Sequence, residues 1–265
     1  KITPIIEPNT KNIINNKNYN IIYNNNIKDL SKCNLVFFSY DTPTDDKMNS
    51  NFNFIKEKIN KAISCINKKS YFIILSQVLP GFTRKIAFPK KNLFYQVETL
   101  IFGKAIQRAL KPERIIVGSH NKKIPNILHN FYDKFSKKII ITNYETAELS
   151  KLSINLYLSS SVALTNTINE LSKKLGSDWL DLKEILKLDN RIGKHSYLDP
   201  GLGMSGGNLE RDHINFINLS NLYKTNNNLV KSFLMNSKYQ KDNFIKLIRK
   251  NIKNYKSIFI YGITY

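Results

Sequence analysis

Short runs of consecutive apolar residues, each closed by polar or turn-forming residues, constrain the fold of the first half more than any other feature. These runs predict strands at 34–40, 71–75, 114–118 and 138–142. Strands that are apolar throughout are buried on both faces, which is typical of a parallel sheet covered by helices. Between the strands, apolar residues recur at helical spacing over 52–68, 97–110 and 125–136. This alternation predicts the α/β class.

The pattern changes near residue 143. Residues 145–175 predict one long helix, because the segment keeps helical spacing and contains neither Pro nor Gly. Gly176 follows as a C-cap. After it, a second helix is predicted over 178–188, then a glycine-rich loop over 191–207 and a mostly helical remainder over 212–255.

The charge balance is strongly basic, with 41 Lys and Arg residues against 20 Asp and Glu and a formal net charge of +21. Such an excess raises the question of nucleic-acid or membrane binding. The lysines are scattered, however, and aromatic residues are not interleaved with a basic stripe, so no nucleic-acid partner is predicted. No apolar stretch of about 18 residues occurs, so no membrane partner is predicted either. A positive field still favours anionic ligands such as nucleotide diphosphates.

The two cysteines, Cys33 and Cys65, show no CxxC spacing and no Cys/His cluster. We therefore predict no metal site and no disulfide framework, which fits a reducing cytoplasm. Cys65 falls on the predicted helix 52–68, and Cys33 precedes a strand. We interpret both as small buried hydrophobic residues.

A set of short segments is more specific in its order and spacing than any one segment is alone. They are 4–8 (PIIEP), 40–43 (YDTP), 76–83 (SQVLPGFT), 112–118 (PERIIVG), 145–155, 169–176, 188–193 and 200–212. Together they resemble the UDP-glucose/GDP-mannose dehydrogenase family over essentially the whole chain.

The resemblance implies an incomplete Rossmann-like parallel sheet domain, followed by an all-helical central dimerisation domain with a long connecting helix. We expect a partial NAD-binding domain at 1–143, without the first strand and GxGxxG loop of the family. The central domain would cover 144–240, and 241–265 would be a linker and the first strand, at 257–265, of a nucleotide-sugar-binding domain. The chain would thus be a truncated piece of a longer cytoplasmic enzyme, homodimeric through its central domain.

The family reaction is an NAD-dependent oxidation of C6 of a nucleotide-linked hexose, such as UDP-glucose, to a uronate for polysaccharide precursors. Lys151 and Asn155 match the family residues that hold the oxyanion and a water. Because they lie four residues apart on one predicted helix, both side chains share a face. Glu148 extends this stripe and is assigned to the substrate. Without the resemblance, the stripe would be interpreted as a solvated face with a Glu148–Lys151 ion pair.

Two further carboxylates match the family. Asp212 matches an aspartate proposed to act as a base with an ordered water, and the alternative is an N-cap or first-turn carboxylate of the next helix. Glu98 aligns with a glutamate that assists the hydrolytic half-reaction. Phe102 stands where the family has a second glutamate, and it cannot take part in acid–base chemistry.

The cofactor is expected at the carboxyl ends of the strands, where open α/β sheets bind ligands. Thr42 and Pro43 are assigned to NAD on this ground. Gln77 stands where the family usually has a threonine, and its amide can still hydrogen-bond a water.

The glycine-rich loop is assigned to the substrate. Gly201, Gly203 and Gly206 satisfy the GxGxxG pattern, but no buried strand precedes them, so a dinucleotide site is not predicted there. Glycines instead let the backbone approach the sugar closely. Arg191 and Lys194 match neighbours of the substrate segment, and an ordinary solvated loop charge is an equal alternative.

Asn208 stands where the family keeps its catalytic cysteine. An amide is not a nucleophile, so the covalent adduct of the second oxidation cannot form at this position. Two hypotheses follow. The protein is an enzyme that stops at the aldehyde or oxidises a hydrated aldehyde, or it is a catalytically silent paralogue that binds without completing the oxidation. The sequence does not identify the sugar or the nucleotide.

Overall fold

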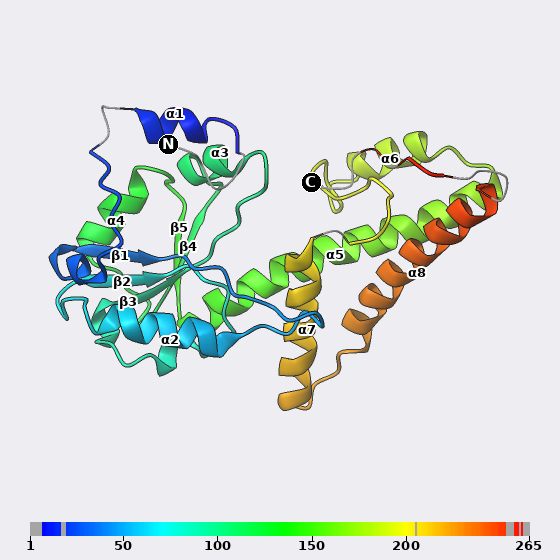
Figure 1. Ribbon diagram of the computed structural model, residues 1–265. Coiled ribbons are helices and arrows are strands. Elements are labelled where there is room, and N and C mark those ends of the chain that lie inside the picture. The colour runs from blue at the N-terminus through cyan, green and yellow to red at the C-terminus, as the bar shows by residue number, and fades with distance from the viewer. Residues whose placement is uncertain (1–6, 17–19, 205, 253–256, 260, 262–265) are drawn as a thin grey trace. The chain divides into compact units, whose positions relative to one another are not determined.

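The computed structural model describes residues 7–16, 20–204, 206–252, 257–259 and 261, and Figure 1 shows its helices and strands. The chain divides into two compact units, residues 1–151 and 152–265. The division falls within helix α5 (Tyr144–Leu175), which contributes to both.

The first unit is built on a five-stranded sheet in the order β1–β2–β3–β4–β5. The strands are β1 (Leu35–Phe38), β2 (Tyr71–Ile74), β3 (Leu93–Gln96), β4 (Ile115–Ser119) and β5 (Ile139–Thr142). Strands β1, β2 and β3 pair in parallel, as do β4 and β5, whereas β3 and β4 are antiparallel. The predicted α/β class with a mostly parallel sheet is confirmed, and the antiparallel pair is a departure from the expected all-parallel sheet.

Helices cover both faces of this sheet. The first unit contains α1 (Thr10–Asn15), α2 (Phe52–Ile63), α3 (Ala105–Leu110) and α4 (Asn126–Asp133), with 3-10 turns η1 (Ile27–Lys32), η2 (Thr83–Lys85) and η3 (Lys90–Asn92), and of these helices α2 and α4 pack on the sheet. Phe72 packs with Ile55 of α2 on one face, and Ile73 packs with Leu128 of α4 on the other. Burial of each such side chain stabilises the fold by about 2 kcal/mol. Two-sided burial explains why these strands are apolar throughout.

The segment 93–110 differs from the prediction. A helix was expected over 97–110, but Leu93–Gln96 forms β3 and only Ala105–Leu110 forms α3. The helix starts late because a distant carboxylate fixes its beginning. Glu7 accepts hydrogen bonds from the N–H groups of Gly103 at 2.9 Å and Ala105 at 2.7 Å. Gly103 has φ +78°, a conformation that a helix does not contain.

The remaining elements of the first unit follow the predicted runs, with shorter helices. α2 ends at Ile63 instead of residue 68, which leaves Cys65 just beyond the helix. Both cysteines are half-buried, so the prediction that they are buried is wrong.

At one point the sheet and α5 approach too closely for any side chain. A Cβ atom on Gly118 of β4 would lie 2.9 Å from the Cβ of Ala147 and 3.0 Å from the Cα of Tyr144. The first turn of α5 is thereby set directly on the backbone of β4. Tyr144 is fully buried, and its hydroxyl donates to the carbonyl of Leu93 at 2.8 Å.

The second unit is helical. Beyond α5 it contains α6 (Trp179–Leu188), α7 (Gly207–Leu222) and α8 (Asn228–Asn251). The long helix predicted over 145–175 is present, and Gly176 with φ +72° follows its last residue. Asp178 caps α6 by accepting a hydrogen bond from the N–H of Leu180.

Some predictions fall wholly or partly outside the described residues. For the strand expected at 257–265, residues 257–259 and 261 have no regular secondary structure, and the others are outside the description. Residues 4–6 of the 4–8 segment and residue 205 are outside it too. Among the described residues, no helix has both the length and the apolar character needed to span a membrane.

Candidate active site

The loops that follow β1 and β2 are joined by hydrogen bonds at the carboxyl edge of the sheet. The hydroxyl of Thr42 donates to the carbonyl of Gln77 at 2.7 Å, and the hydroxyl of Ser76 donates to the carbonyl of Tyr40 at 2.5 Å. Thr42 is buried, whereas Pro43 beside it is exposed. The structure thus brings Thr42 and Gln77 together, and Pro43 is the exposed residue beside them.

Gln77 has an unusual environment. The side chain is 7% exposed, and neither amide atom has a hydrogen-bond partner among the described residues. Leaving a buried amide unpaired costs about 1–3 kcal/mol per group. A donor and an acceptor side by side are therefore available for a water or a ligand.

Glu148 on α5 is fully buried, and it organises the turn after β2. Its carboxylate accepts hydrogen bonds from the N–H groups of Gly81 at 2.6 Å and Thr83 at 2.8 Å. Burial raises the pKa of Glu148 to about 7, although the bonds from Thr83 and Gly81 lower it. The interpretation of this position as part of a solvated face is wrong. Its assignment to the substrate stays a prediction.

Lys151 lies one turn further along α5. Its ammonium donates to the backbone carbonyl of Glu98, in the loop that follows β3. The Glu98 side chain is half-buried and accepts from the N–H of Thr99 at 2.6 Å. Burial raises the pKa of Glu98, and the charge of Lys151 partly opposes that rise. The first unit therefore brings together two of the predicted catalytic residues.

Phe102, which replaces the second glutamate of the family pattern, lies in the same loop. Its side chain is 65% exposed. A large exposed aromatic next to Glu98 contributes apolar surface and no proton-transfer group.

The second unit brings together two further predicted catalytic residues, Asn155 and Asp212. The amide of Asn155 donates to one carboxylate oxygen of Asp212 at 2.5 Å, and the guanidinium of Arg211 donates to the other at 3.3 Å. Asp212 is fully buried and Arg211 is 5% exposed. Asp212 lies beyond the first turn of α7, which begins at Gly207 with Gly206 as its N-cap, so the N-cap or first-turn alternative is wrong.

Two neighbours of Asp212 were not predicted as site residues. Arg211 is its ion-pair partner, and His213 is fully buried with Nδ1 2.7 Å from the carbonyl of Leu209. Burial lowers the pKa of His213, which favours the neutral ring. The signal available in the sequence was the run of four ionisable residues at 210–213, which is unusual for a buried helical segment.

Asn208 is the second residue of α7 and is exposed. The loop before it is anchored at two of its glycines, Gly201 and Gly203. The N–H of Gly201 donates to the side-chain oxygen of Asn166 at 2.8 Å, and Gly203 packs against Ser237 of α8 so closely that a Cβ atom would lie 2.7 Å from its hydroxyl. Gly203 thus has a packing role in addition to the substrate role predicted for the loop.

The two loop cations differ in their contacts. Arg191 is exposed and forms a two-point ion pair with Asp189, with the shorter contact at 2.6 Å. Lys194 is exposed as well. Their assignment to the substrate stays a prediction. Among the described residues, no group of His, Cys, Asp and Glu could hold a metal ion.

Comparisons with known proteins cover most of the chain. The model of the UDP-glucose/GDP-mannose dehydrogenase family, NAD binding domain, matches residues 1–136, and the model of its central domain matches residues 145–238. The chain is 29% identical to UDP-glucose 6-dehydrogenase of Rickettsia typhi, over 92% of this chain and 58% of that protein. It is 30% identical to UDP-glucose 6-dehydrogenase of Campylobacter jejuni, over 82% of this chain and 56% of that protein.

Solved structures show the same fold. A UDP-glucose dehydrogenase from Pyrobaculum islandicum superposes with a TM-score of 0.78 at 22% identity, over 86% of this chain and 56% of that one. The UDP-D-ManNAc dehydrogenase from Pyrococcus horikoshii gives a TM-score of 0.79 at 20% identity, over 95% of this chain and 62% of that one. The chain therefore spans less than two thirds of these relatives.

Proposed function

Because the chain belongs to the UDP-glucose/GDP-mannose dehydrogenase family, we propose that it is an NAD-dependent nucleotide-sugar dehydrogenase. The substrate would be a nucleotide-linked, UDP-glucose-like hexose oxidised at C6, and the product would serve polysaccharide precursor synthesis in the cytoplasm. The observation that carries the proposal is the buried Asp212, held by Asn155 and Arg211. A purely structural position would be filled at least as well by apolar residues, because desolvating such a pair is costly.

NAD would bind at the carboxyl edge of the sheet and accept a hydride there. Thr42 and Pro43 would border it, and Gln77 fits such a group because its buried amide has no protein partner among the described residues. A water or a carboxamide supplies the complementary donor and acceptor.

In the first oxidation, the C6 hydroxyl loses a proton while the carbon loses a hydride, and one alcohol becomes one aldehyde. The carboxylate of Asp212 would receive the proton, directly or through a water held with Asn155. The ammonium of Lys151 would stabilise the developing alkoxide. Both roles need ionised groups, and the guanidinium of Arg211, 3.3 Å from the carboxylate of Asp212, supplies a counter-charge beside it.

The second oxidation has to proceed without a thiol, because Asn208 cannot form a covalent adduct. Water would add to the aldehyde to give a hydrate, which then loses a second hydride and a second proton to become the carboxylic acid, and the acid releases a third proton to give the carboxylate. Glu98 would accept a proton from this water, since its raised pKa makes it a better base. Glu148, Arg191, Lys194 and the glycines 201, 203 and 206 remain the proposed contacts to the substrate.

The protein would be a homodimer through its helical domain. Four large apolar side chains on α5 are each more than half exposed: Tyr157, Leu164, Leu171 and Leu175. The first three recur every seven residues and so lie along one face of the helix. A second copy would cover this face, and replacing Leu164 and Leu171 with glutamate would convert a dimer to a monomer in light scattering.

The test of the activity is the number of NADH molecules formed per UDP-glucose by the full-length protein. Two would support oxidation through the hydrate, and one would support arrest at the aldehyde. None, with every nucleotide sugar tried, would contradict the proposal. The variant Asn208→Cys, with Asn208→Ser as its matched control, would restore the nucleophile and raise a yield of one towards two.

A catalytically silent paralogue is the second candidate. Asn208, the exposed Phe102 and Gln77 favour it, because each departs from the family pattern, and the first two do so at positions that would serve the second oxidation. Calorimetry separates the two functions: tight binding of NAD and UDP-glucose without any NADH would support the silent protein.

A further inference from the structure

A basic pocket lies at the end of the sheet opposite the proposed cofactor edge. Its lining comes from three segments of the first unit: 68–71 before β2, 89–92 before β3, and 121–125 between β4 and α4. Thr42 and Gln77 follow the ends of β1 and β2, whereas this pocket lies where β2 and β3 begin. The cavity is therefore separate from the site assigned above, and its volume is about 670 Å³.

The lining is positively charged without compensation. Ten residues line the pocket, among them Lys68, Lys69, Lys91 and Lys123, and none is acidic. Lys and Arg make up 41 of 265 residues, so a random set of ten would contain fewer than two. Among the described residues, none of these four ammonium groups has a carboxylate within 4.0 Å, whereas lysines such as Lys137 and Lys238 do pair with acids.

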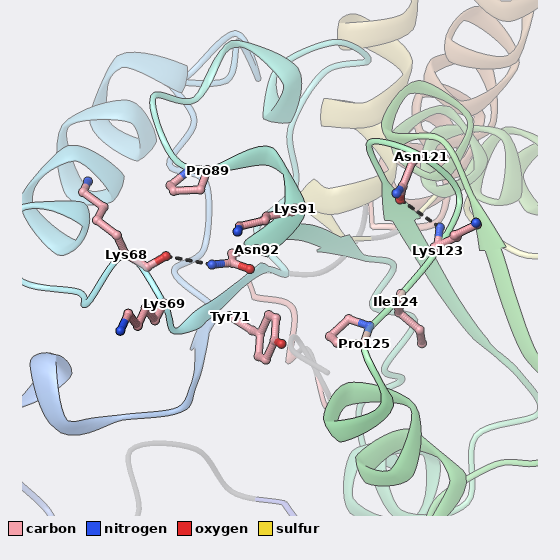
Figure 2. Close-up of a pocket in the computed structure, with 10 residues that line it drawn as sticks. All are labelled: Lys68, Lys69, Tyr71, Pro89, Lys91, Asn92, Asn121, Lys123, Ile124 and Pro125. Atoms are coloured by element: carbon pink, nitrogen blue, oxygen red, sulfur yellow. Dashed lines mark hydrogen bonds between the residues drawn. The ribbon is translucent and has the colours of Figure 1, made fainter.

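The walls of the pocket are preformed. The side chain of Asn92 is 7% exposed and donates to the carbonyl of Lys68 at 2.7 Å, which ties two of the segments together. Figure 2 shows Lys68, Lys69 and Lys91 on one side and Lys123 with Pro125 on the other. Proline restricts the backbone, so these walls need little ordering when a ligand binds.

A second positive element begins at the edge of the same cavity, next to the lining residue Pro125. Helix α4 starts at Asn126 directly after Pro125, and its N-terminus has no side-chain cap. The first N–H groups of a helix attract anions. Lysines bind phosphate as mobile point charges, and Tyr71, Ile124 and the prolines provide apolar surface beside them.

We propose that this pocket binds a small organic phosphate, with its anionic groups among Lys69, Lys91, Lys123 and the start of α4 and its carbon skeleton against Tyr71. The volume suits a ligand of that size better than an inorganic phosphate ion. The site is independent of the dehydrogenase function proposed above and would remain if that function were disproved.

Titration calorimetry of the full chain with fructose 1,6-bisphosphate tests the proposal. This probe carries two phosphates but no base and no nicotinamide, so it does not imitate the nucleotide ligands. At about 0.15 M salt, where diffuse surface attraction is largely screened, we expect saturation at one molecule per chain. The triple variant Lys69→Gln, Lys91→Gln and Lys123→Gln should bind at least about tenfold more weakly.

The matched control removes the same charge elsewhere in the first unit, with Lys56→Gln, Lys61→Gln and Lys111→Gln, all at exposed positions. It should bind the probe as the unmodified chain does. An equal loss of affinity in both triple variants, or no saturable binding, would show that only diffuse electrostatic attraction acts on the probe. Either result would overturn the proposal. Inorganic phosphate binding as tightly as the bisphosphate would overturn the assignment to an organic ligand. If the pocket triple variant does not fold, the single variants Lys91→Gln and Lys123→Gln replace it.

Discussion

Two fully buried carboxylates, one in each unit, are held by opposite means. Glu148 is bonded by the backbone N–H groups of Gly81 and Thr83, whereas Asp212 is bonded by the side chains of Asn155 and Arg211. Backbone donors belong to the fold itself, so Glu148 fixes a turn. Side-chain donors can be exchanged by mutation, and a buried charge that depends on them is hard to explain by stability alone. The comparison distinguishes a carboxylate held by the backbone, Glu148, from the candidate catalytic carboxylate, Asp212, held by side chains.

The largest expected effect comes from Asp212→Asn. The change removes a counter-charge from beside Arg211, which is 5% exposed, and the free energy of unfolding should fall by about 3–5 kcal/mol. Urea denaturation measures it. The double variant Arg211→Met with Asp212→Asn should recover much of the stability but none of the activity. Recovery of turnover in the double variant would remove Asp212 from the mechanism.

A smaller effect, on rate instead of stability, is expected for Lys151→Met. Its ammonium donates to a backbone carbonyl, that of Glu98, and the loss of this bond should cost the folded state about 1 kcal/mol. The loss of a cation near the developing alkoxide should lower kcat by about 100-fold. Steady-state kinetics and thermal unfolding on one preparation separate the two quantities, with Lys174→Met at the end of α5 as a control. An unchanged kcat would contradict the assigned role.

The pH dependence of Glu148 sharpens the comparison further. Its pKa is raised to about 7 in the folded protein, above the ordinary value of 4.5. The folded state therefore holds the proton more tightly, and this contribution to stability is complete below pH 4.5 and is lost as the pH rises through about 7. Relative to Glu148→Gln, which does not titrate, the protein should lose about 2 kcal/mol between pH 5 and 8. Thermal unfolding at several pH values measures the difference, and parallel curves would show that the carboxylate stays ionised.

The smallest effect is expected at Gln77. Its buried side-chain amide has neither a backbone nor a side-chain hydrogen-bond partner among the described residues. Replacing it with methionine removes an unpaired amide and keeps the volume, so stability should stay the same or rise by about 1 kcal/mol. Affinity for NAD, measured by fluorescence titration, should fall if the amide serves the cofactor. Stability lost with affinity unchanged would point to a bound structural water instead.

Much of the fold could be predicted from local pattern. Helix α5 was predicted almost to its ends, because 32 residues without Pro or Gly leave no place to stop before Gly176. Strand β3 was missed, because its four residues follow two lysines and precede a stretch with helical spacing. The late start of α3 depends on Glu7, nearly a hundred residues away, and no local pattern carries that contact.

The candidate site, like the fold, has a part that could be predicted from the sequence and a part that could not. Lys151, Asn155 and Asp212 could be identified because they lie in segments that resemble a family. The partnership of Glu148 with Gly81 and Thr83 could not, since it joins a helix to a turn 65 residues or more away. The sequence predicted which residue types are present, and the packing decides which of their atoms remain available for chemistry.

The contact between β4 and α5 also limits how this chain can change over evolutionary time. At Gly118, even one added methyl group would collide with Ala147 and with the backbone of Tyr144. A larger residue at position 118 would fit only if the buried helix α5 moved away from β4. That shift would require a second mutation at the same time as the first. In a library of all single variants scored for folding alone, position 118 should therefore accept only glycine, while Gly201, which has open space around it, should tolerate many residues.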